Sequence, residues 1–244
     1  EPVYREALKL SEQGEPYVIA TVVQTKGSTP QKAGAKLLIR KDGSGVGTLG
    51  GGCVEGDIWF AAKEVLRRHE GPEYRDYYLN EEIAARDGLV CGGTMYFFID
   101  PVWEPEAMLP VSRDIVGAYE GRQPVALATL IKVGSQGGTL GTKLFVHHDG
   151  SSEGSLGTKD RDRLAAEAAQ RLMDYGLNQQ VEVVDGSELF VEAYTTPASL
   201  VLVGGGHIAR AVAPLAKMLG FRLFVLDDRR EFANRERFPE AEDI

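Results

Sequence analysis

The sequence has few cysteines, no long apolar run and no excess of basic residues. Two cysteines in 244 residues are too few for a disulfide scaffold, so we expect a reducing, cytoplasmic environment. No stretch approaches the roughly 20 apolar residues of a membrane span, and no signal segment opens the chain. A net charge of −9 argues against nucleic acids and anionic membranes as partners. The composition therefore predicts a globular protein that binds neither nucleic acid nor membrane.

The chain contains an internal repeat. The segment that starts at Val18 aligns without a gap with the segment that starts at Val125, at an offset of 107 residues. Each copy predicts a strand, a glycine loop, a strand, an Asp-Gly turn, a short third element, a helix and two further strands. We therefore expect an α/β fold in which residues 1–197 form one duplicated domain, with repeats at about 18–101 and 125–195. Its sheet is predicted to be mixed and at least partly antiparallel.

The two copies differ at the places where the cysteines lie. The first copy reads Gly-Gly-Cys at residues 51–53, whereas the second reads Thr-Lys-Asp at residues 158–160. The first copy also carries an insertion between its last two strands, which contains Cys91 and two glycines, Gly92 and Gly93. Because duplicated halves share a core and specialise at a site, both differences point to a site in the first copy.

A glycine-rich helix start followed by a cysteine favours an anion and a reactive thiol. Glycines let a ligand approach the backbone, and the free amides and helix dipole of a helix start attract anions. The same position lowers the pKa of a thiol and favours the thiolate that attacks electrophiles or binds metals. The alternative is that Cys53 and Cys91 are small core residues and the glycines form a tight turn. A zinc site is poorly supported, because the sequence has no CxxC pair.

The C-terminal segment, residues 198–244, predicts a strand, a glycine loop, a helix and a second strand that ends in acidic residues. Gly204 and Gly206 begin a dinucleotide fingerprint with alanine in its last place, and Asp227 follows where a ribose-binding acid belongs. His207 either contacts the ligand or caps the helix. We expect the start of a Rossmann-type domain that binds NAD(P) or another nucleotide. One βαβ unit cannot cover a parallel sheet, so we expect this domain to be truncated or completed by a partner chain.

Four stretches together resemble the xanthine dehydrogenase accessory protein family (XdhC/CoxI). They read GSTPQKAGAKLLI, GTLGGGCVEGDI, LVCGGTMYFFIDP and the C-terminal run that begins LVGGGHIARAVAPLAK, and they cover most of residues 18–101 and 200–244. The resemblance implies an accessory protein rather than an enzyme. Such a protein binds the molybdenum cofactor (molybdopterin), assists its sulfuration by a cysteine desulfurase, and delivers it to apo xanthine dehydrogenase or a related molybdenum hydroxylase.

The resemblance also suggests roles for the residues of the first copy. The expected cofactor contacts are Gly50, Gly51, Gly52, Cys53, Glu55, Cys91, Gly92 and Gly93. The three glycines at 50–52 would cradle the phosphate, Cys53 would face the molybdenum or a transferred sulfur, and Cys91 would assist nearby. Glu55, expected to be exposed in the first helical turn, would bond an edge of the pterin.

Two other functions stay open on the sequence alone. An NAD(P)-dependent oxidoreductase is supported by the fingerprint and by Asp227, although the sequence shows no obvious acid–base constellation. An assembly module with core cysteines is the second alternative. Pseudo-symmetric halves with sheet edges also favour a homodimer.

Overall fold

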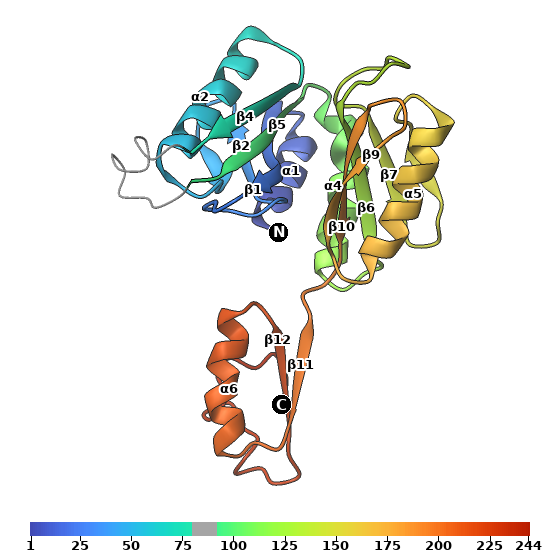
Figure 1. The fold of residues 1–244 in the computed structure, drawn as a ribbon. Coiled ribbons are helices and arrows are strands. Elements are labelled where there is room, and N and C mark those ends of the chain that lie inside the picture. The colour runs from blue at the N-terminus through green and yellow to red at the C-terminus, as the bar shows by residue number, and fades with distance from the viewer. Residues whose placement is uncertain (80–91) are drawn as a thin grey trace. The chain divides into compact units, whose positions relative to one another are not determined.

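The structure is a computed structural model that describes residues 1–79 and 92–244. The chain divides into two compact units, Glu1–Thr195 and Thr196–Ile244 (Figure 1). Each unit has its own sheet or sheets and its own hydrophobic core.

The first unit consists of two copies of one arrangement. The first copy comprises α1 (Pro2–Gln13), β1 (Tyr17–Lys26), β2 (Lys36–Arg40), β3 (Gly45–Gly47), α2 (Gly52–Arg68), β4 (Glu73–Tyr78) and β5 (Thr94–Val102). The second comprises α4 (Pro105–Tyr119), β6 (Val125–Lys132), β7 (Lys143–His147), β8 (Ser152–Gly154), α5 (Lys159–Met173), β9 (Asn178–Glu182) and β10 (Glu188–Tyr194). The strand orders match, β3-β2-β1-β5-β4 and β8-β7-β6-β10-β9. The predicted duplicated α/β fold is confirmed.

Each copy has a separate five-stranded sheet, and every strand pair in both sheets is antiparallel. The predicted mixed sheet therefore reduces to its antiparallel part. A helix also precedes the first strand of each copy, and the sequence comparison missed it because α1 and α4 share position and burial but little sequence. The repeat is thus longer than the aligned segments.

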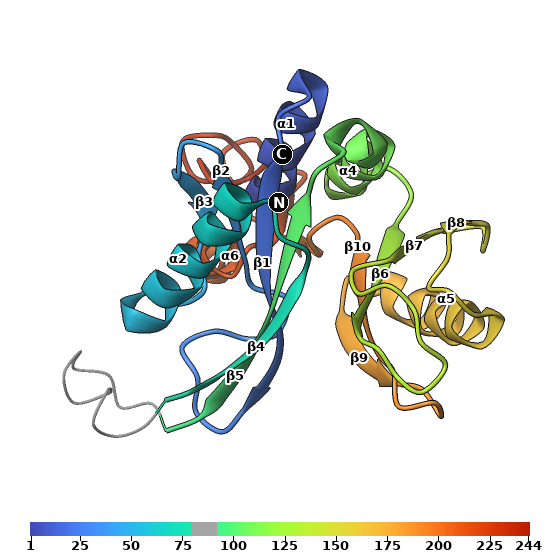
Figure 2. The same ribbon diagram turned by 90° about the horizontal axis from the view of Figure 1, so that it is seen from above.

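Two helices cover the outer faces of the sheets, and two lie between the copies. The apolar stripes of α2 and α5 pack on the first and second sheets, respectively. The residues of α1 and α4 share one core with the inner faces of both sheets, and Figure 2 shows these two helices side by side. The strand β1 is buried from Tyr17 to Val23 because both of its faces are covered, as its unbroken apolar run requires.

The register of the strands corrects the gap-free alignment. Thr21 pairs with Lys36 in the first sheet, and Thr129 pairs with Lys143 in the second. The two lysines are 107 residues apart, but the two threonines are 108 apart. A one-residue slip turns every side chain of a strand to the opposite face, so burial decides the register. The connecting loop is accordingly one residue shorter in the second copy.

The second unit is a single βαβ arrangement. It contains β11 (Ser199–Val203), α6 (His207–Met218) and β12 (Arg222–Leu226), and the two strands pair in parallel. Small residues of α6 pack on β12 together with Phe238, which is fully buried. The predicted Rossmann-type βαβ unit is confirmed.

Candidate functional site

Two glycines of the motif segments pack tightly against the loop that follows β1. A Cβ atom at Gly50 would lie 2.8 Å from the Cβ of Pro30. A Cβ atom at Gly93 would lie 2.5 Å from the carbonyl oxygens of Lys26 and Ser28. Such contacts are too short for any side chain, so both positions require glycine. The structure thus brings three of the motif segments together at one end of the first sheet.

The start of α2 is an unusual backbone conformation. Gly50, Gly51 and Gly52 have φ angles of 113°, 73° and 68°, in the left-handed region that favours glycine. Gly51 is the N-cap, and among the described residues no side chain caps the helix. A Cβ atom at Gly51 would meet no described atom within 4 Å. The first turn of α2 therefore lies beside open space, as an anion site at a helix start requires.

Glu55 holds the glycine loop in place. One carboxylate oxygen, Oε2, accepts hydrogen bonds from the hydroxyl of Thr48 at 2.6 Å and from the backbone amides of Leu49 and Gly51 at 2.6 and 3.2 Å. Burial alone would raise the pKa of Glu55, but these hydrogen bonds outweigh it and lower the pKa below its ordinary value. Glu55 is half-buried, so the exposed position predicted for it is wrong.

The same contact recurs in the second copy, which shows that it belongs to the fold. Asp162 accepts hydrogen bonds from the hydroxyl of Ser155 at 2.8 Å and from the amide of Leu156 at 2.6 Å. Asp162 and Glu55 are 107 residues apart, at the same position of the repeat. The carboxylate is therefore a structural support for the loop in both copies.

The second copy closes its helix start with its own side chains. Thr158 caps α5 by accepting a hydrogen bond from the amide of Arg161 at 3.3 Å. The fully buried guanidinium of Arg161 donates to the carbonyl oxygens of Leu156 and Gly137 and forms an ion pair with Asp185 at 2.6 Å. The equivalent positions in the first copy hold a glycine and a valine. The helix start is thus open in one copy and filled in the other.

Sequence reasoning did not identify Arg161 as important. Its signal was present in the aligned copies, where a basic residue replaces the apolar Val54 of an amphipathic helix. A charge at a core-facing position predicts a buried partner, and Asp185 in the following turn is that partner.

Cys53 is exposed at the beginning of α2. The alternative in which Cys53 is a core residue beneath the helix is therefore wrong. Gly92 is exposed and Gly93 is buried beside the loop after β1, whereas Cys91 lies outside the described residues. In the ranges that the structure describes, no cluster of three or more histidine, cysteine or acidic side chains is arranged to hold a metal ion.

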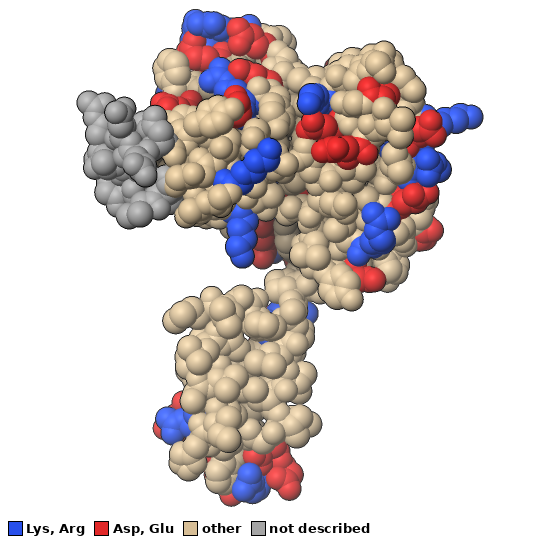
Figure 3. Space-filling view, in the orientation of Figure 1, with Lys and Arg blue, Asp and Glu red and all other residues tan. Residues whose placement is uncertain are grey.

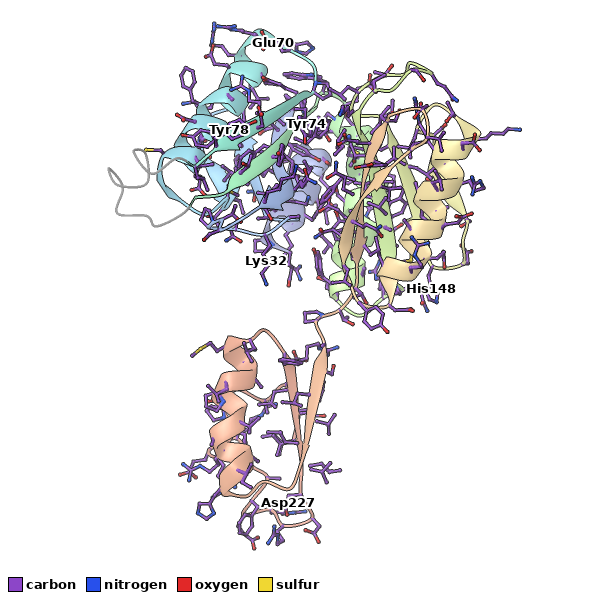
Figure 4. All side chains as sticks on the ribbon, viewed as in Figure 1. Lys32, Glu70, Tyr74, Tyr78, His148 and Asp227 are labelled. Atoms are coloured by element: carbon purple, nitrogen blue, oxygen red, sulfur yellow. The ribbon has the colours of Figure 1, made fainter. Side chains whose placement is uncertain are left out.

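The glycine loop of the second unit is tied to Asp227. This side chain, at the end of β12 (Figure 4), is only 2% exposed. Its carboxylate accepts hydrogen bonds from the side chain of Arg229 at 2.9 and 3.0 Å and from the amide of Gly205 at 2.8 Å. Arg229 and these amides hold the pKa of Asp227 well below its usual range. A ribose would have to displace Arg229 to reach this carboxylate.

The other predicted nucleotide contacts line the loop between β11 and α6. Gly204 has a φ angle of 99°, Gly206 is the N-cap of α6, and His207 is exposed at the first position of the helix. The three residues line a surface hollow of about 660 Å³. Asp227 lines a neighbouring hollow, of which Gly204 and Arg229 form the shared wall. The expected residues therefore surround the loop, but in two hollows.

The surface shows no feature that favours a membrane or nucleic acid. No helix within the described ranges combines the length and apolar character needed to cross a membrane. On the face of the molecule drawn in Figure 3, positive and negative side chains are interspersed. The acidic composition has no counterbalancing basic face in that view.

Comparison with known proteins identifies two matching family models. The model described as the XdhC and CoxI family matches residues 10–77 and 118–184, which is more than half of the chain. The model described as the XdhC Rossmann domain matches residues 200–243. The two halves of the first match fall on the two copies of the repeat.

Several curated proteins are similar to this chain. A probable xanthine dehydrogenase subunit of Bacillus subtilis is 25% identical over 96% of this chain and 66% of its own length. The molybdenum cofactor insertion chaperone PaoD of Escherichia coli is 27% identical over 51% of this chain and 37% of its own. The uncharacterized protein YqeB of Escherichia coli is 38% identical over 40% of this chain and 18% of its own. The chain thus spans less than two-thirds of each relative.

A solved structure has the same fold. The crystal structure described as a xanthine dehydrogenase from Bacillus halodurans matches all of this chain and 68% of its own, with a TM-score of 0.64. The sequence identity is 23%, so the likeness concerns the fold alone.

Proposed function

Because the chain belongs to the XdhC and CoxI family, we propose that it binds the molybdenum cofactor and delivers it to apo xanthine dehydrogenase or a related molybdenum hydroxylase. Two of its relatives support this proposal, the molybdenum cofactor insertion chaperone and the probable xanthine dehydrogenase subunit. The cofactor is the cargo of such a protein, which needs a site that binds it firmly and then releases it.

The observation that carries the proposal is the difference between the two helix starts. A duplicated protein with only structural needs would close both copies in the same way, as Thr158 and Arg161 close the second. The first copy instead has left-handed glycines, an uncapped N-terminus as far as described, and an exposed thiol at the first turn of α2. Backbone amides at this turn suit the cofactor's phosphate, and a thiolate suits molybdenum or sulfur.

We assign the roles within this site as follows. Gly51 and Gly52 allow the phosphate to approach the amides of α2, because no side chain stands between them and solvent. Cys53 faces the metal or a sulfur supplied by a cysteine desulfurase, which we propose as a second partner. Glu55 acts indirectly, since its carboxylate fixes the loop that these residues form.

Binding of released molybdenum cofactor tests the proposal. The cofactor is titrated anaerobically against the parent chain and the variants Cys53→Ser and Thr158→Gly, and retained pterin is measured by fluorescence after ultrafiltration. We expect binding to the parent, at least about tenfold weaker binding to Cys53→Ser, and parent-like binding to Thr158→Gly. The last variant is the matched control, because it alters the equivalent turn in the other copy.

Two outcomes would contradict the proposal. Failure of the parent to bind the cofactor would remove the accessory function from this chain. Equal binding to the parent and Cys53→Ser, with equal activation of the target enzyme, would remove the role of Cys53.

The NAD(P)-dependent oxidoreductase gains no support from the geometry. Its main evidence was Asp227, and that carboxylate is buried against Arg229. We keep nucleotide binding by the second unit as a prediction, independent of the cofactor site.

A further inference from the structure

Two symmetry-related ion pairs join the copies of the first unit. Lys36 of β2 contacts Glu192 of β10, with 2.7 Å between Nζ and Oε1. Lys143 of β7 contacts Asp100 of β5, also with 2.7 Å between nitrogen and oxygen. The sheet registers place Lys36 and Lys143 at equivalent positions, and likewise Asp100 and Glu192. Each copy therefore gives one cation and receives one from the other.

One of these ion pairs lines a large cleft. The cleft has a volume of about 530 Å³, within the usual range for sites of small molecules. Its walls come from both copies and include Lys36, Glu192, Tyr119, Tyr194, Asn178 and Thr48. The equivalent ion pair of Lys143 and Asp100 does not line this cleft. The pseudo-symmetry thus provides a reference for what the fold alone requires.

The polar groups of the cleft are prearranged. The side chains of Lys36 and Glu192 are 8% and 11% exposed, so the pair is largely removed from water. Tyr194 donates to Glu192 at 3.2 Å, and its hydroxyl lies 2.7 Å from that of Tyr4. Burial and the charge of Glu192 raise the pKa of both tyrosines, so each keeps its proton near neutral pH. A fixed carboxylate, an ammonium group and hydroxyl groups therefore meet at one wall.

The cleft is connected to the glycine loop of the candidate site. Thr48 lines the cleft, donates to Glu55 at 2.6 Å and accepts a hydrogen bond from the amide of Gly50 at 3.1 Å. Gln31 also lines the cleft, and its Cγ would lie 3.2 Å from a Cβ at Gly50. The residues at this end of the cleft thus belong to the loop that precedes α2.

We propose that the cleft binds the 2-amino-4-oxo pyrimidine edge of a pterin, with Glu192 accepting from its amino and ring N–H groups and Lys36 donating to its oxygen. A carboxylate complements two adjacent donors on a planar ring, and an ammonium group complements the neighbouring oxygen. The half-buried Tyr119 provides an aromatic wall for the ring. This inference rests on the proposed function, since it assigns the ring of the same cargo to the cleft. Guanine presents the same edge, so the test must separate the two.

Fluorescence titration with 6-hydroxymethylpterin tests the cleft alone, because this probe has neither phosphate nor dithiolene. The variants are Glu192→Gln, Tyr119→Ala and the mirror-image control Asp100→Asn, each with its unfolding free energy measured. We expect binding to weaken by at least about tenfold in the first two, as loss of a charged hydrogen bond predicts, and to stay parent-like in Asp100→Asn. Tyr119→Ala leaves the ion pair intact and so keeps the test valid if Glu192→Gln unfolds.

Several results would overturn the inference. They are absence of pterin binding to the parent, parent-like binding in both cleft variants, or equal loss in Asp100→Asn. Tighter binding of guanosine than of the pterin, with the same response to the variants, would also overturn the pterin assignment. If Glu192→Gln and Tyr119→Ala retain the whole cofactor as the parent does, the inference fails while the proposed function stands. If pterin binding responds as expected but the parent does not retain the whole cofactor, the proposed function fails.

Discussion

Arg161 and Asp185 form an ion pair of 2.6 Å in the second copy, and their side chains are 0% and 4% exposed. The pair fills the region between the helix start of α5 and the turn before β10. In the first copy, Val54 stands in place of the arginine, and the inserted segment stands in place of the turn. The same fold therefore has one filled and one open helix start, which is the basis for placing the cargo site in the first copy.

Replacement of Arg161 by valine, its counterpart in the first copy, tests the structural role of the filled site. The change leaves the Asp185 carboxylate without its cation, so we expect the free energy of unfolding to fall by about 3 kcal/mol. Urea denaturation measures the loss. Cofactor binding should not change, and unchanged stability or lost binding would each contradict this assignment.

Two glycines of α2 predict opposite effects of substitution by alanine. Gly51 has a φ angle of 73°, so Gly51→Ala should destabilise the protein by about 1 kcal/mol. Gly56 lies within the helix, and a Cβ there would meet no described atom within 4 Å. Gly56→Ala should therefore stabilise by about 0.5–1 kcal/mol. Thermal unfolding of both variants measures the difference, and effects of the same sign would show that the loop is not held as described.

Glu55 predicts a pH-dependent stability. Its pKa is lowered from the ordinary value of 4.5 in the folded state, so its contribution is present above that value and is lost as pH falls through the folded pKa. Glu55→Gln should lower stability by about 1 kcal/mol near pH 7, allowing for partial exposure. Urea titrations of both proteins between about pH 3 and pH 7 measure the gap. A gap that persists at the acidic end would contradict the role of the ionised carboxylate.

The ion pair of Lys36 and Glu192 predicts non-additive mutations. Lys36→Met leaves a largely buried carboxylate without its cation and should cost about 3 kcal/mol. The double variant Lys36→Met/Glu192→Leu removes both charges, so it should recover much of that loss. Unfolding free energies of the two single variants and the double variant complete the cycle. Additive losses would show that the two side chains do not act as a pair.

The sequence predicted the features that depend on local pattern. The Asp-Gly turns, apolar strands and amphipathic helices identified the duplication, and the glycine loop before α6 identified the βαβ unit. It did not predict the equivalence of α1 and α4, because two helices that share only position and burial leave no aligned residues. The offset of 108 in the first strand also escaped, since only burial on both faces decides that register.

The candidate site was predicted in outline but not in its contacts. Glycines and a cysteine before a helix indicate a site by their residue types alone. The partners of Glu55 and Asp227 could not be foreseen, because a carboxylate at a helix start or strand end suits either a ligand or the protein's own amides. Arg161 and the cleft at Lys36 depend on residues more than 20 positions apart, which periodicity does not connect.

The most direct test of the account converts the open helix start into the filled one. The triple variant Gly51→Thr/Gly52→Lys/Cys53→Asp gives the first copy the residues of the second at this position. Binding of released molybdenum cofactor is measured by anaerobic ultrafiltration, and folding is checked by urea denaturation. The account predicts a folded protein that no longer retains the cofactor. Retention equal to that of the parent by a folded triple variant would contradict it.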